Sequence, residues 1–72
     1  MFSHFNPETV VILTRAQKAA MKEWEATEPS ASSMLRALAE ASVARTILEA
    51  AASGERDPER LKQAALSEMA FA

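Results

Sequence analysis

A stop and a restart between two helical stretches constrain the fold of this chain more than any other feature. Gly54, the single glycine, follows a long Ala-rich run and can adopt the left-handed conformation that ends a helix. Asp57 is placed to cap the next helix with its carboxylate, and Pro58 loses no useful hydrogen bond at the first helical position. These signals predict helix, turn and helix over the C-terminal half.

The N-terminal part begins with the same arrangement of cap, proline and acid. Asn6 is expected to cap a helix that starts at Pro7, and Phe5 and Val10 have the spacing of a hydrophobic staple. Pro29 disfavours helical geometry at the residue before it, so this helix should end nearby. The three predicted helices cover residues 7–27, 32–53 and 58–70.

Composition supports an all-α domain spanning residues 1–72. Sixteen alanines favour helix but bring little surface to bury, and the chain has 72 residues in all. We expect two long antiparallel helices with a short third helix folded back across the second. Because a core of this size is only marginally stabilising, we expect homo-oligomerisation, with a dimer favoured, to complete it. A compact monomer with some exposed Val and Leu is the alternative.

The middle predicted helix is apolar on two sides. One stripe carries Met34, Leu38, Ala41, Leu48 and Ala52; nearly opposite lie Ala39, Val43, Ile47 and Ala50. A helix of this kind packs against neighbours on two sides. We predict that the first helix does not reach Val43 and Ile47, so that a second chain covers them. The candidate interface comprises Val43, Ile47, Ala39, Ala50, Phe2 and Trp24.

No constellation of residues points to an enzyme, a cofactor or a metal. His4 is the only histidine and the chain has no cysteine, so a metal ligand set cannot be assembled around it. The serines of the linker, at Ser30, Ser32 and Ser33, have the usual position of capping residues. Trp24 shares a helical stripe with Leu13, which favours core or interface over stacking on a ligand.

Charge argues against nucleic acid and membrane partners. The net charge is −2, and no apolar run approaches the roughly 20 residues that span a bilayer. The start of the chain does not resemble a signal peptide and disulfides are excluded, so we expect a cytoplasmic protein. The helix-turn-helix at 32–69 keeps one alternative open, a small DNA-associated regulator. Its candidate nucleic-acid contacts are Arg56, Arg60, Lys62 and Gln63, although glutamates are interspersed with them.

Two segments resemble known sequences. Residues 44–66, ARTILEAAASGERDPERLKQAAL, resemble a helix–turn–helix segment of a family of small bacterial helical proteins, whose members also begin with a phrase like FNPETVVIL. A similar segment forms a helical spacer in a family of bacterial transposases with RNase-H-like catalytic domains, but their catalytic motifs are absent here. The small-protein family has no established activity, so the resemblance implies a fold more than a function.

These patterns together predict a non-enzymatic helical interaction module. We expect it to self-associate and to dock an amphipathic partner helix, with the DNA-associated regulator as the alternative.

Overall fold

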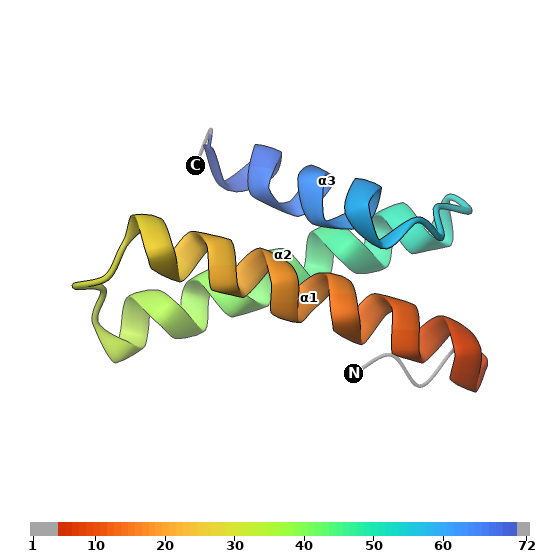
Figure 1. The fold of residues 1–72 in the computed structure, drawn as a ribbon, viewed down its shortest axis with the longest axis horizontal. Helices are drawn as coiled ribbons and strands as arrows, with labels where there is room; N and C mark the ends of the chain where they lie inside the picture. The colour runs from red at the N-terminus through yellow and green to blue at the C-terminus, as the bar shows by residue number, and fades with distance from the viewer. Residues whose placement is uncertain (1–4, 71–72) are drawn as a thin grey trace.

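Over residues 5–70 the protein is an all-α bundle of three helices, as the sequence predicts. A computed structural model describes residues 5–70, and in it α1 spans Pro7–Thr27, α2 spans Ser33–Ala52 and α3 spans Pro58–Ala70. Each bound lies within one residue of the predicted range. Helices α1 and α2 run in opposite directions, and α3 returns antiparallel to α2 while packing against both (Figure 1).

Local chemistry sets the helix boundaries. The side chain of Asn6 accepts a hydrogen bond from the N–H of Thr9 at 2.8 Å, and Ser32 accepts one from the N–H of Leu35 at 3.1 Å. These bonds satisfy backbone donors that a helix leaves without partners in its first turn. Of the linker serines weighed as caps, Ser32 is the one that caps α2.

The turn after α2 is a Schellman motif centred on Gly54. This glycine has φ of 107°, and its N–H donates to the carbonyl of Ala51 at 3.0 Å. The N–H of Glu55 donates to the carbonyl of Ala50 at 3.1 Å, which completes the paired bonds of the motif. Asp57 then accepts from the N–H of Glu59 at 3.0 Å, so the predicted stop and restart are both present.

The core is small and is shared by all three helices. Its largest fully buried side chains are Leu13 of α1, Val43 and Ile47 of α2, and Leu61 of α3. Alanines fill much of the remaining core, and they let the helices approach closely because a methyl group occupies little space. The buried alanines in contact with this cluster are Ala16, Ala20, Ala39, Ala51 and Ala65.

The predicted packing of α2 is wrong in one respect. Val43 and Ile47 are 0% exposed and belong to the same core cluster as Leu13 and Leu61, so α1 and α3 both pack on that side of the helix. The physical reason is that α3 returns on the side where α1 already lies (Figure 1), so that one stripe of α2 is buried by both helices in a single core. The opposite stripe, around Met34 and Leu38, is the one without cover from the described chain.

Candidate functional site

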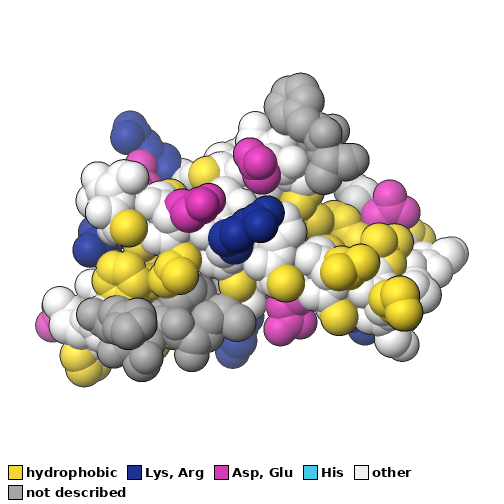
Figure 2. Space-filling view, turned by 180° about the vertical axis from the view of Figure 1, so that it is seen from behind, with side chains coloured by type: hydrophobic (Ala, Val, Ile, Leu, Met, Phe, Trp, Pro, Cys, Tyr) yellow, Lys and Arg dark blue, Asp and Glu magenta, His cyan; other side chains and the backbone are white. Residues whose placement is uncertain are grey.

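The uncovered part of α2 carries an exposed apolar surface. Met34 is 75% exposed, Leu38 is 63% exposed and Leu35 is 45% exposed, although leucine and methionine are usually buried. Figure 2 shows hydrophobic side chains gathered over the first half of this helix, at the right of the view. We call Met34, Leu35 and Leu38 the apolar patch.

A groove of about 330 Å³ adjoins the apolar patch where α1, α2 and α3 meet. Trp24 of α1 and Met69 of α3, both half-buried, line the groove beside Leu35 and Leu38. We call this depression the end groove; its remaining lining residues are Glu28, Ala39 and Ser42. The end groove and the apolar patch together form a solvent-exposed surface on which large hydrophobic side chains are adjacent, as they are in a helix-bundle core.

Carboxylates surround this end of the bundle. They are Glu23 and Glu25 of α1, Glu28 directly after α1, and Glu68 of α3. The end groove is lined by Glu28, which also caps the C-terminus of α1. Neither α1 nor α3 has a basic residue in its last turn, and both helices end here (Figure 1). Because a helix C-terminus carries partial negative charge, the rim is acidic beyond its formal charges.

Ion pairs account for two of these carboxylates. The Nε of Arg36 lies 3.7 Å from an Oε2 of Glu25, and the Nζ of Lys62 lies 2.6 Å from the Oε2 of Glu23. Among the ion pairs of the described residues, none involves Glu28. This carboxylate is therefore available at the edge of the end groove.

The residues predicted to contact a second chain are divided between core and surface. Val43 and Ile47 are 0% exposed in the chain's own core, so another molecule does not reach them in this fold. Ala39 is 7% exposed and lies at the wall of the end groove. Ala50 is half-buried against the core, and Trp24 lines the end groove. Phe2 lies outside the described residues, as does His4.

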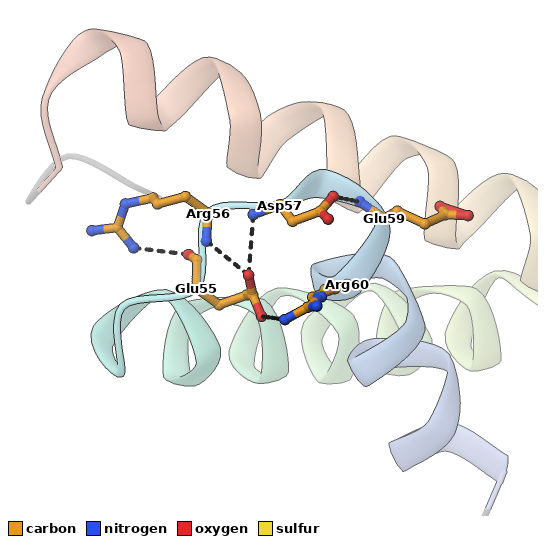
Figure 3. Close-up of polar contacts among 5 residues, drawn as sticks. All are labelled: Glu55, Arg56, Asp57, Glu59 and Arg60. Carbon is orange, nitrogen blue, oxygen red and sulfur yellow. Dashed lines mark hydrogen bonds and ion pairs between the residues drawn. The ribbon is translucent and has the colours of Figure 1, made fainter.

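Arg56, one of the predicted nucleic-acid contacts, is bound within the chain. Its Nη1 donates to the carbonyl of Ala51 at 2.7 Å. The same atom donates to the carbonyl of Glu55 at 2.8 Å (Figure 3). Its guanidinium also lies 5.4 Å from the ring centroid of Phe5, within the range of a cation–π interaction. This side chain fastens the segment before α1 to the end of α2.

The other predicted nucleic-acid contacts do not form one cationic face. The side chain of Lys62 is only 16% exposed and is paired with Glu23 and Glu59. Arg60 is 75% exposed, with its Nη1 3.9 Å from an oxygen of Glu55 (Figure 3), and Gln63 is exposed. Of the four, Lys62 is largely covered and Arg56 is exposed but held by the chain's own carbonyls, which leaves Arg60 and Gln63 as exposed side chains without such hydrogen bonds to the backbone.

Sequence reasoning missed that Met34, Leu35 and Leu38 form the exposed apolar surface. It placed Met34 and Leu38 correctly on one stripe, yet that stripe carries the same apolar signal as the buried one. It also missed that Trp24 and Met69 line one groove, because nothing in the sequence indicates that these two residues lie close together.

Comparisons with family models, curated proteins and solved structures give no match. Within residues 5–70, no helix is both long enough and apolar enough to cross a membrane. The described residues also hold no group of three or more His, Cys, Asp or Glu side chains placed to share a metal ion.

Proposed function

We propose that this protein is a non-enzymatic helical interaction module, which docks a helix on the apolar patch and the end groove. The observation that carries the proposal is the exposure of Met34 and Leu38 beside a groove lined by Trp24 and Met69. An amphipathic helix that lays its apolar face in such a groove covers side chains that water otherwise contacts.

The energetics favour docking here over the other exposed apolar positions. Burying an exposed leucine or methionine side chain contributes about 1.5–3 kcal/mol to the free energy of binding. Covering three such residues therefore offsets part of the free-energy cost of association. Val11, by contrast, is 56% exposed near the start of α1, and its groove is lined by the polar or charged residues Thr14, Arg15 and Lys18 as well as Val10. The apolar patch is the surface where large exposed hydrophobic side chains are adjacent.

Self-association remains part of this proposal, but through a different surface from the one predicted from the sequence. Since Val43 and Ile47 are buried, a second copy would have to pack on the apolar patch instead. Sedimentation equilibrium tests this directly, because a monomer has a mass of 7.8 kDa. A higher mass that falls to the monomer value in Leu38→Glu would support self-association through the apolar patch.

Photo-crosslinking in producing cells tests docking itself. A benzophenone amino acid is introduced at Leu38 in one variant and at Val11 in a control variant, and both positions are exposed. The proposal expects a discrete adduct from position 38, either with a second copy or with another protein, and none of matching yield from position 11. Absence of an adduct at position 38, or equal adducts at both positions, would contradict it.

A further inference from the structure

We infer that the end groove and the apolar patch bind a cationic amphipathic helix of a partner protein, an inference that rests on the proposed function. The apolar side of the inference follows from spacing. Met34 and Leu38 are one helical turn apart, and Leu35 lies between them beside Trp24 and Met69. A helix with apolar residues at i, i+3 or i+4, and i+7 matches such a groove.

The negative charge around the end groove favours a partner helix with positively charged residues on its polar face. Glu28 lines the end groove, and it also lines the adjacent groove that Trp24, Leu66 and Met69 form between α1 and α3. Lysine or arginine residues flanking the apolar face of a bound helix would lie near this carboxylate and near the C-termini of α1 and α3. Opposite charges arranged in this way raise the rate of association of the partner helix and fix its orientation in the groove.

The cations at this end of the bundle pair with Glu23 and Glu25, and the ion pairs of the described residues leave Glu28 and Glu68 uncompensated. Arg36 is paired with Glu25, and Lys62 is paired with Glu23 and Glu59. Lys22 is exposed, but it lies two residues before Trp24 and therefore on roughly the opposite side of α1. The N-terminus of α2 contributes partial positive charge. The Ser32 side chain caps this end of the helix by accepting a hydrogen bond from the N–H of Leu35.

A second copy of the chain fits the same surface less well. A two-fold symmetric contact uses the same surface of both protomers, so each of them brings the Glu28 carboxylate to the interface. The net charge of −2 for each chain adds to this repulsion. A cationic helix supplies the same apolar contacts and the opposite charge.

Fluorescence of Trp24 provides the test, because it is the only tryptophan and it lines the end groove. The probe is the synthetic peptide LKKLLKLLKKLLKL, whose leucines gather on one helical face and which contains no tryptophan. We expect saturable binding with a shift of Trp24 emission toward shorter wavelength. Two comparison peptides have glutamate in place of lysine, or the same residues in an order that scatters the leucines around the helix. Both should bind at least ~10-fold more weakly.

Variants of the protein separate the two parts of the recognition. Leu38→Ser should weaken peptide binding about 10-fold, since it removes an apolar contact without changing charge. Glu28→Gln should weaken binding about 2- to 5-fold at low salt and less at high salt. Val11→Ser, a similar loss at an exposed position outside the groove, should leave binding unchanged. Unchanged circular dichroism shows that each variant is folded.

Four results would overturn the inference. The first is equal affinity for the scattered peptide, which would reflect charge alone. The second is wild-type affinity in Leu38→Ser, which would place binding elsewhere. The third is a wild-type dimer that dissociates in Leu38→Ser and that the peptide does not disrupt, which would assign the surface to a second copy. The fourth is an adduct at position 38 in cells together with no peptide binding, which would leave docking intact and remove only the cationic partner.

Discussion

The ammonium group of Lys62 lies 2.6 Å from a carboxylate oxygen of Glu23, and this contact joins α3 to α1. A second carboxylate, from Glu59 one turn earlier on α3, lies 3.1 Å from the same nitrogen. Most of the Lys62 side chain is covered, and its charge is matched by these two carboxylates at the edge of the bundle. The contact therefore has a structural role and removes this lysine from any cationic surface on α3.

The alkaline stability of the protein should depend on Lys62. The hydrogen bonds from its ammonium to Glu23 and Glu59 raise the pKa of Lys62 above the ordinary 10.5, the bond to Glu23 being the largest cause. A raised pKa in the folded state stabilises the fold fully below pH 10.5, and that contribution is lost as pH rises through the folded-state pKa. The free energy of unfolding should therefore fall in this range.

Urea unfolding at a series of alkaline pH values measures this effect. Lys62→Met keeps most of the buried aliphatic stem but removes the charge, so its stability should be lower at neutral pH and change less above pH 10.5. Lys22→Met removes an exposed lysine of α1 and serves as the control. Parallel pH profiles for wild type and Lys62→Met would contradict the assignment.

Gly54→Val should destabilise the fold by about 1–2 kcal/mol, because a residue with a Cβ resists the left-handed conformation. The φ of 107° at Gly54 requires this conformation, and an added Cβ would meet no atom within 4 Å. Backbone strain is thus the whole expected cost. D-alanine at position 54, introduced by chemical synthesis, prefers positive φ and should unfold at a urea concentration no lower than wild type.

Asp57→Ala should cost about 1 kcal/mol, since it removes the side chain that accepts from the N–H of Glu59. Asp57→Asn retains an acceptor oxygen and should lose much less. Thermal unfolding of both variants provides the measurement. If the two substitutions cost the same, the cap contributes through charge and not through this hydrogen bond.

The helix boundaries could be predicted because each depends on a few neighbouring residues. Gly54, Asp57 and Asn6 act through their own backbone freedom or through hydrogen bonds to groups two or three positions away. Such local signals can be read from the sequence without knowledge of how the helices pack. The same reasoning identified three helices, but not the side of the second helix on which the first and third both pack.

The exposed face of α2 could not be predicted in this way. Val43 and Leu38 belong to stripes of similar hydrophobicity, and the choice between them depends on where α1 and α3 both pack. That choice is made by the summed contacts of three helices with Val43 and Ile47, not by any local signal. The end groove has the same origin, since Trp24 and Met69 are far apart in the chain and meet only in the fold.

Glutamate substitutions on the two stripes of α2 should therefore have opposite consequences. Val43→Glu places a carboxylate where wild type is 0% exposed, next to Ile47 and Leu13, and no cation is available in that core cluster. Burying an unpaired charge costs several kcal/mol, and a domain of this size has little more stability than that. We expect Val43→Glu to lose its cooperative thermal transition in circular dichroism.

Leu38→Glu changes a residue that is 63% exposed, so it should remain folded with a free energy of unfolding within about 0.5 kcal/mol of wild type. A folded Val43→Glu variant with reduced sedimentation mass would instead restore the second chain to that face of α2 and contradict the packing described above.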